Sequence, residues 1–229
     1  MNIRLHYQEK GVGTPLLLLH GNGESSEYFT HQIEYFSAWY RVIAIDTRGH
    51  GTSPRGIAPF SISQFADDLY AFMERLALKQ AIVLGFSDGA NIAARFTLRY
   101  PEKVKLLILN GGNLDAGGVK RSVQLPIEIG YRIARCFAGK SAAARRNAEL
   151  LGLMVNDPNI EPDELRQICV PVLVIAGTRD MIQERHTRLI AESIPNAELC
   201  FLKGDHFIAA REPEAFNEAV RQFLERNSC

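Results

Sequence analysis

The chain has 229 residues, 46% of them hydrophobic and 23% charged, which is the balance of an ordinary globular protein with one sizeable core. Lysine plus arginine number 26, and so do aspartate plus glutamate. Because the formal net charge is zero, composition gives no reason to expect nucleic acid or a membrane surface as a partner.

The four cysteines are far apart and form no C-x-x-C pair (Cys136, Cys169, Cys200 and Cys229). This spacing argues against a structural zinc site and predicts no disulfide framework. The first residues, "MNIRLHYQEKG", lack the apolar core of a signal peptide, and no apolar run approaches the length needed to span a membrane. We therefore expect a reduced, cytoplasmic protein that binds no metal.

Short apolar runs alternate with helical patterns along the chain. An alternating run at Asn2–Glu9 suits an edge strand, and six later runs read as strands: Leu16–His20, Arg41–Asp46, Ala81–Phe86, Lys105–Asn110, Pro171–Gly177 and Ala197–Lys203. Helical patterns lie between them, at Glu27–Ala38, Ser63–Leu76, Asp88–Tyr100, Gln183–Ile194 and Pro213–Glu225. The middle strands are apolar on both faces, which predicts an α/β fold with a mostly parallel sheet covered by helices on each side.

One interval breaks the alternation. Residues 111–168 contain no strand candidate, only a Gly-rich entry and helical patterns at Leu125–Phe137 and Ala142–Val155. Binding sites in such sheets gather at the carboxyl ends of the strands, so an insertion entering there suits a lid over the site. We expect a core domain of residues 1–110 and 169–229 with a helical lid at 111–168; the alternative is extra helices packed on the surface.

The stretch "VLGFSDGAN" (Val83–Asn91) places a serine between two glycines at the end of a predicted strand. Gly85, Ser87 and Gly89 match the pattern G-x-S-x-G, and a helical pattern follows at once. So tight a turn holds the serine in a strained backbone conformation, and the glycines leave the space that the turn needs. The hydroxyl then lies near a helix N-terminus, whose amide groups stabilise negative charge. Ser87 is therefore a candidate nucleophile.

A serine nucleophile needs a base to remove its proton. Five of the six histidines fall in the edge strand, in helical patterns, in the turn "RGHG" or at a strand end, where structural or exposed roles suffice (His6, His31, His186, His50 and His20). The sixth, His206 in "KGDHF", follows the last predicted strand beside Phe207. His206 is therefore the candidate base.

The base needs an orienting acid. Asp180 in "AGTRDMI" follows a predicted strand on a short turn, and one helix and one strand separate it from His206. Asp115 is the rival, because it lies just beyond the preceding strand and could also reach a histidine at the top of the sheet. Asp205 is too close in sequence to His206 to reach around its ring and reads as a turn residue. The sequence favours Asp180.

Five motifs stand in the order typical of one family: "HGNGES", "DTRGHGTS", "GFSDGAN", "GTRD" and "GDHF". The chain thus resembles the α/β-hydrolases over nearly its whole length. The resemblance implies that Ser87 is the nucleophile, Asp180 the acid and His206 the base. It also implies an oxyanion hole formed by the main-chain N–H groups of Asn22 and Asp88, and a structural turn at "DTRGHGTS".

The chain departs from the family at its first strands. Members commonly begin with two antiparallel strands before the "HG" strand, whereas only Asn2–Glu9 precedes it here. We therefore expect about seven strands, with the shortened edge far from Ser87.

The implied reaction is acyl transfer to water on a small or medium carboxylic ester, with no cofactor. Thioester, amide, lactone and carbon–carbon hydrolysis use the same apparatus, and the fold does not choose among them. A small-molecule receptor with slow hydrolysis and a scaffold protein are alternatives from other functional classes. The sequence leaves open whether the protein is a monomer or a homodimer.

Asp88 directly follows the candidate nucleophile, and two roles are open for its side chain. A carboxylate in the first turn of a helix complements the helix dipole and caps main-chain amides. Alternatively it faces the pocket and pairs with an ammonium or hydroxyl group of the substrate. Asp88 and Asp115 are thus the candidate substrate-binding side chains. The seven basic residues between Gly111 and Leu151 indicate no sign for the substrate's charge.

Overall fold

A seven-stranded sheet with the order β1-β3-β2-β4-β5-β6-β7 forms the centre of the computed structural model, which describes residues 3–227. The strands are β1 (Tyr7–Lys10), β2 (Pro15–Leu19), β3 (Arg41–Ile45), β4 (Ala81–Phe86), β5 (Val104–Asn110), β6 (Val172–Gly177) and β7 (Ala197–Leu202). Only β1 runs antiparallel to its neighbour, and the other ladders are parallel. The predicted α/β class and the seven strands are confirmed.

The edge strand is shorter than predicted. It covers Tyr7–Lys10, whereas the prediction was Asn2–Glu9, of which Asn2 lies outside the described residues. Tyr7 is paired with Ile45, the last residue of β3. Residues before Tyr7 have no strand opposite them, because the chain turns away after Ile45; one further main-chain bond, from Asp46 N–H to the carbonyl of His6, closes the ladder.

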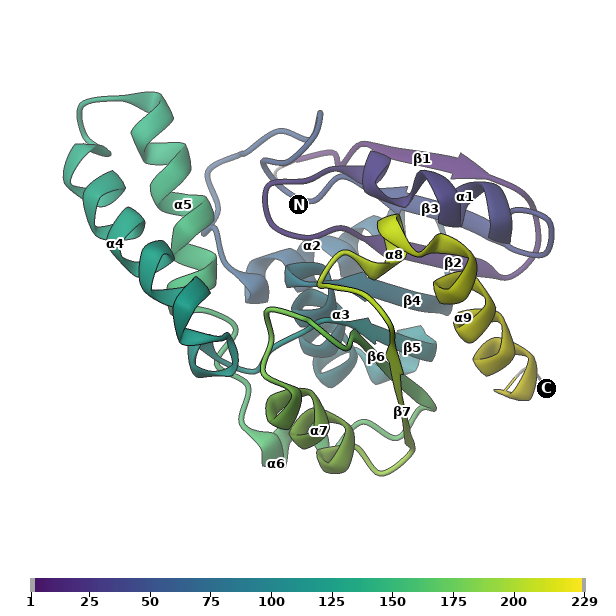
Figure 1. Ribbon diagram of the computed structural model, residues 1–229. Helices are drawn as coiled ribbons and strands as arrows, with labels where there is room; N and C mark the ends of the chain where they lie inside the picture. The colour runs from purple at the N-terminus through teal and green to yellow at the C-terminus, as the bar shows by residue number, and fades with distance from the viewer. Residues whose placement is uncertain (1–2, 228–229) are drawn as a thin grey trace.

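Helices cover both faces of the sheet (Figure 1). The helical segments are η1 (Ser26–Phe29), α1 (Thr30–Phe36), α2 (Ile62–Arg75), α3 (Asp88–Arg99), η2 (Pro101–Lys103), η3 (Ala116–Gly118), α4 (Arg121–Phe137), α5 (Ala142–Asn156), α6 (Pro162–Leu165), α7 (Glu184–Ser193), α8 (Ile208–Arg211) and α9 (Pro213–Asn227). The predicted helix at Glu27–Ala38 is divided into η1 and α1. The one-turn helices α6 and α8 are too short to show a helical period in the sequence.

Alternate side chains of each inner strand enter two separate cores. In β2, Leu17 and Leu19 belong to the core that also contains residues of α2, α3 and α7, whereas Leu16 and Leu18 belong to the core that contains residues of α1 and α9. All four leucines are buried. A strand buried on both faces cannot alternate polar and apolar residues, which explains the continuous apolar runs in the sequence.

Residues 111–168 contain no strand, as predicted, and their two long helices pack against each other. In Figure 1 the α4–α5 pair extends away from the sheet, beyond the carboxyl ends of the strands. The short α6 differs, because it contacts α3 and α7 of the sheet's own helical layer. None of the helices in residues 3–227 combines the length and the apolar composition that crossing a bilayer requires.

The turn "DTRGHGTS" holds a buried ion pair. The guanidinium of Arg48, 1% exposed, donates from Nη2 and Nε to the two carboxylate oxygens of Asp68 on α2, at 2.6 and 2.7 Å. Arg48 also donates to the carbonyl of Arg55. The fork geometry satisfies both charges inside the protein, and it fixes the turn after β3 to the helix that covers the neighbouring strands.

Removing one partner of this pair leaves the other charge buried and unpaired. We expect Asp68→Asn to lower the free energy of unfolding by about 3–5 kcal/mol, measured by urea denaturation. The double variant Arg48→Met/Asp68→Leu should recover most of that loss. As a matched control, Asp67→Asn on the same helix breaks the exposed pair with Arg99 and should cost less than about 1 kcal/mol. Equal effects of Asp68→Asn and Asp67→Asn would contradict this account.

Candidate active site

The candidate residues meet at the carboxyl ends of four strands. Ser87 directly follows β4, and Asp180 and His206 lie in the loops after β6 and β7. Asn22 lies in the loop after β2, which is the neighbour of β4 in the sheet. After β2 the chain continues to one side of the sheet, and after β4 it continues to the other. The carboxyl ends of β2 and β4 therefore flank the crevice in which α/β folds bind ligands.

Ser87 has a strained backbone. Its φ of 54° and ψ of −120° lie in a region that residues with a Cβ rarely occupy. The turn is tight because a Cβ on Gly85 would lie 2.1 Å from the carbonyl oxygen of Gly89, and one on Gly89 would lie 2.0 Å from that of Leu19. The two glycines of the motif are thus required by close backbone contacts, as the pattern predicts.

The side chains of Ser87, His206 and Asp180 form a hydrogen-bonded chain. The Ser87 Oγ lies 3.0 Å from His206 Nε2, and His206 Nδ1 lies 2.7 Å from Asp180 Oδ1. The tautomer that satisfies both contacts carries its proton on Nδ1, so Nε2 is free to accept the serine proton. His206 and Asp180 are 5% and 4% exposed, whereas Ser87 is half-buried and opens toward a cavity.

The loop that carries Asp180 is held by the segment after β5. Val119 and Ile182 form an isolated antiparallel bridge, and the Ile182 N–H donates to Asp180 Oδ1.

A further residue that sequence reasoning missed is Gly111, whose φ is +62°. A Cβ there would lie 3.0 Å from the His206 ring and 3.3 Å from Asp180 Oδ2. Gly111 directly follows the strand that precedes the predicted lid, and this position was the signal that could have identified it.

The remaining histidines lie away from Ser87. The His20 ring bridges the carbonyl of Gly21 and the N–H of Thr47, so it shapes the loop after β2 as predicted. The Nε2 of His186 accepts the N–H of Leu114. His6 contacts Asp46 and His50 contacts Thr47. His31 lies exposed on α1.

The two rival aspartates serve local turns. Asp115 is exposed, and its carboxylate accepts the Gly117 N–H at the start of η3. Asp205 accepts the N–H of Phe207 and pairs with Arg211. Asp180, and neither of these two, contacts the His206 ring nitrogen.

The expected oxyanion groups come from the start of α3 and from the loop after β2. Asp88 is the first residue of α3, so its N–H has no partner within the helix. Asn22 lies on the loop after β2 and lines the same cavity as Ser87. Its side chain donates to the carbonyl of Leu150 on α5 at 2.7 Å, which connects this loop to the inserted helices. The geometry is compatible with the oxyanion hole that the family resemblance predicts.

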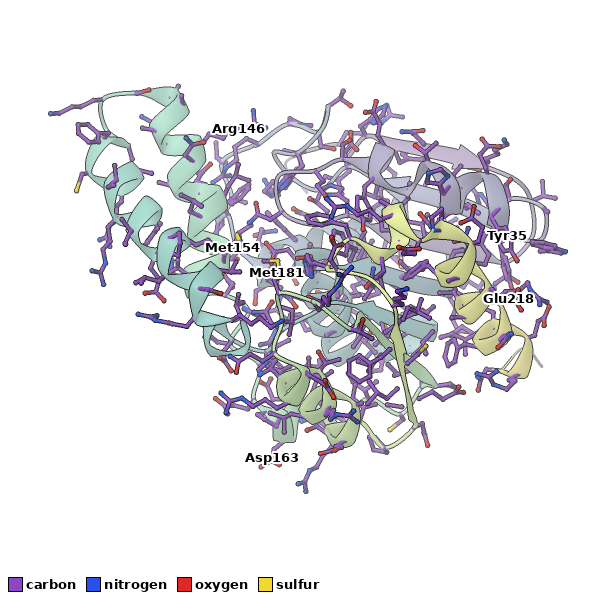
Figure 2. The ribbon with its side chains drawn as sticks, viewed as in Figure 1. Tyr35, Arg146, Met154, Asp163, Met181 and Glu218 are labelled. Carbon is purple, nitrogen blue, oxygen red and sulfur yellow. The ribbon has the colours of Figure 1, made fainter. Side chains whose placement is uncertain are left out.

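The cavity above Ser87 has a volume of about 160 Å³ and mostly apolar walls. Helix α5 contributes Leu150, Leu151 and Met154, and Met181 follows β6. Figure 2 shows Met154 and Met181 approaching each other where α5 lies over the strand ends. Phe86, Phe207, Gly21, Asn22, Glu24 and His206 complete the lining.

The Asp88 side chain does not line this cavity. It is 8% exposed, and Asn91 Nδ2 donates to its Oδ1 at 3.3 Å, while its Oδ2 has no partner within residues 3–227. Burial raises the pKa of the Asp88 carboxyl to about 6, and Asp157 adds to the rise, although the amides of Asn22 and Asn91 oppose it. Asp115 does not line the cavity either.

The carboxylate that does line the cavity is Glu24. Its Oε2 accepts the Gly21 N–H at 3.2 Å, and burial raises its pKa to about 7 against the opposing effects of that hydrogen bond and of His206. Sequence reasoning missed this residue, although it belongs to the quoted motif "HGNGES". Within residues 3–227 no group of three or more His, Cys, Asp or Glu side chains has the arrangement of a metal site.

Comparison with known proteins agrees with this geometry. A family model described as alpha/beta hydrolase fold matches residues 14–127, and one described as serine hydrolase (FSH1) matches residues 75–215, more than half of the chain. The chain belongs to the α/β-hydrolase fold family. The predicted resemblance is therefore confirmed.

Relatives of this hydrolase carry out different reactions. The chain is 26% identical to the 3-oxoadipate enol-lactonase 2 of Acinetobacter baylyi, covering 98% of this chain and 94% of that protein. It is 30% identical to a putative carbamate hydrolase, RutD, of Azorhizobium caulinodans, covering 96% and 94%. A thermophilic esterase from Thermogutta terrifontis has the same fold, with a TM-score of 0.84, 23% identity and coverage of 99% and 95%. These comparisons support a hydrolase without choosing the bond that it cleaves.

The contact between Asp180 and His206 predicts the effect of removing the acid's charge. Asp180→Asn should lower kcat by about three to four orders of magnitude, because an amide no longer holds the required His206 tautomer. Asp115→Asn should leave kcat unchanged, since that carboxylate caps only η3. Steady-state hydrolysis of an aryl ester measures both. The reverse pattern would assign the acid's role to Asp115.

Proposed function

We propose that this α/β-hydrolase is a serine hydrolase that cleaves small or medium carboxylic esters. The observation that carries the proposal is the hydrogen-bonded chain from Ser87 Oγ through His206 to Asp180, which opens into a cavity. A serine in reach of a neutral imidazole that is oriented by a buried carboxylate is the arrangement that acyl transfer requires.

In the proposed mechanism, His206 Nε2 takes the proton of Ser87 as the oxygen attacks the ester carbonyl. The main-chain N–H groups of Asn22 and Asp88 stabilise the oxyanion, and Asp180 stabilises the imidazolium. His206 then gives its proton to the leaving alcohol, and an acyl-enzyme forms on Ser87. Water, activated by His206, attacks that ester, and the second tetrahedral intermediate collapses to release the acid and regenerate Ser87.

The cavity supports the size and polarity of the proposed substrate. Apolar side chains such as Leu150, Leu151 and Met154 favour burial of a hydrocarbon part. We propose that α4 and α5 act as a lid, because α5 supplies this wall and is fastened to the core twice. Asn22 donates to the Leu150 carbonyl, and Arg55 donates from Nε and Nη2 to the carboxylate of Glu149. A lid of this kind reduces the bulk water around the charges that develop during acyl transfer.

A cyclic ester is the second candidate substrate. The full-length similarity to an enol-lactonase supports it, since opening a lactone uses the same attack on an ester carbonyl. The leaving alcohol then stays attached to the acyl group. Thioester, amide and carbon–carbon substrates are weaker candidates for which the cavity offers no specific support.

A panel of neutral substrates tests the proposal. The wild-type enzyme should turn over short aryl and alkyl esters and simple lactones repeatedly, and Ser87→Ala should lower kcat/KM by at least about three orders of magnitude. Steady-state kinetics at constant pH measures both. A single stoichiometric turnover without steady hydrolysis would instead indicate a receptor with incidental chemistry. Full activity of Ser87→Ala would contradict the proposed nucleophile.

A further inference from the structure

The cavity contains a carboxylate that no protein cation neutralises. Within residues 3–227, the contacts of the Glu24 side chain are the Gly21 N–H and neighbouring groups of the cavity, and it takes part in no ion pair. A side chain on Gly21 would lie 3.1 Å from Glu24 Oε2 and 3.1 Å from the Phe86 ring, so carboxylate and ring are close together. Partial burial of an unpaired carboxylate is unfavourable, and a cationic ligand would reduce that cost.

Two aromatic rings line the same cavity. Phe86 and Phe207 line the cavity with Glu24, and their ring centroids are 5.7 Å apart. Tyr28 stacks on Phe86 at 4.4 Å, and its hydroxyl is buried with no hydrogen-bond partner in the described part of the chain. Ring faces next to a carboxylate are the combination that binds substituted ammonium groups, through cation–π attraction and direct charge attraction.

The other charges near this corner do not neutralise Glu24. Arg211 lies over the Phe207 ring at 5.1 Å, but its guanidinium is paired with Asp205. His206 is the titratable group whose charge acts on Glu24, and it is already held by Asp180. Glu24 in turn raises the pKa of Tyr28 above its usual value, together with burial, the larger cause.

We propose that Glu24, with the rings of Phe86 and Phe207, forms a binding site for a substituted ammonium group of the substrate, so that the enzyme prefers cationic esters over neutral ones of the same shape. This inference rests on the proposed ester hydrolysis. The sequence left open whether Asp88 pairs with a group of the substrate. The proposal assigns that pairing to Glu24 instead.

The titration of Glu24 gives the proposal a pH signature. Burial places the pKa of this carboxyl at about 7, so it is largely neutral in mild acid and ionised in mild base. Attraction of a cation requires the ionised form. A preference for cationic esters should therefore grow as the pH rises through 7, and it should be lost as the pH falls.

Acetylcholine and its neutral carbon isostere, in which a tert-butyl group replaces the trimethylammonium group, are the probes. Their charges do not titrate, and both need the same Ser87 and His206, so the ratio of their kcat/KM values isolates the cation. We expect the ratio to rise about tenfold from about pH 5.5 to about pH 8.5. Acetylcholine carries its cation on the alcohol side of the ester bond. Matched p-nitrophenyl esters that carry the trimethylammonium or the tert-butyl group on the acyl chain test the acyl side.

Glu24→Gln removes the charge at almost constant shape. The ratio should then stay at its low-pH value throughout, whatever the absolute kcat/KM values of the variant are. Glu27→Gln, three residues further on an exposed helical turn, is the matched control and should keep the wild-type profile. A wild-type ratio near 1 at every pH, on both sides of the bond, would overturn the proposal, whether or not Glu24→Gln folds.

Failure of the ammonium site and failure of the esterase proposal give different results. Hydrolysis of neutral esters with no cation preference would refute only the ammonium site. If no ester is turned over, ligand-observed NMR with choline and its neutral carbon isostere still decides. Choline binding that strengthens above pH 7 and is lost in Glu24→Gln supports the site, whereas equal binding of the two compounds contradicts it.

Discussion

The close backbone contact at the end of β4 is the constraint on which the site depends. Gly85 passes against the Gly89 carbonyl, and Gly89 passes against the Leu19 carbonyl at the end of β2, at separations that exclude any Cβ. These contacts hold Ser87 at φ 54° and ψ −120°, at a backbone cost of about 1–3 kcal/mol. The two-sided apolar core of the sheet, far larger in total burial, keeps β2 and β4 in register and so maintains this strained turn.

The remaining parts of the site reach Ser87 from independent loops, each fixed to the core by its own contacts. The His20 ring holds the loop after β2, a short antiparallel bridge holds the Asp180 loop, and the glycine at 111 leaves room for the His206–Asp180 pair. Helix α5 lines one wall of the cavity with apolar side chains. Rigid placement of this kind preorganises the charges that acyl transfer needs. The half-buried Glu24 is the exception, an ionisable group on the cavity wall that takes part in no ion pair within residues 3–227.

Much of this was predictable from sequence because the signals are local. Continuous apolar runs indicated strands buried on both faces, and G-x-S-x-G placed a serine at a strand-to-helix turn. The proximity of Ser87, Asp180 and His206 followed from the rule that parallel strands end at one edge. What the sequence left open or missed was the direction in which single side chains point. Asp88 is buried against Asn91, while Glu24 lies in the cavity, and only tertiary packing decides between them. The exact extent of β1 depended likewise on where β3 ends.

The identity of the nucleophile is the central claim, and covalent trapping tests it most directly. The enzyme would be treated with a fluorophosphonate and digested, and the modified residue located by tandem mass spectrometry. The account predicts one adduct per chain, on Ser87, formed more slowly in Asp180→Asn because His206 is no longer held in the reactive tautomer. An adduct on any other residue, or unchanged labelling of the chain when Ser87 is replaced by alanine, would contradict it.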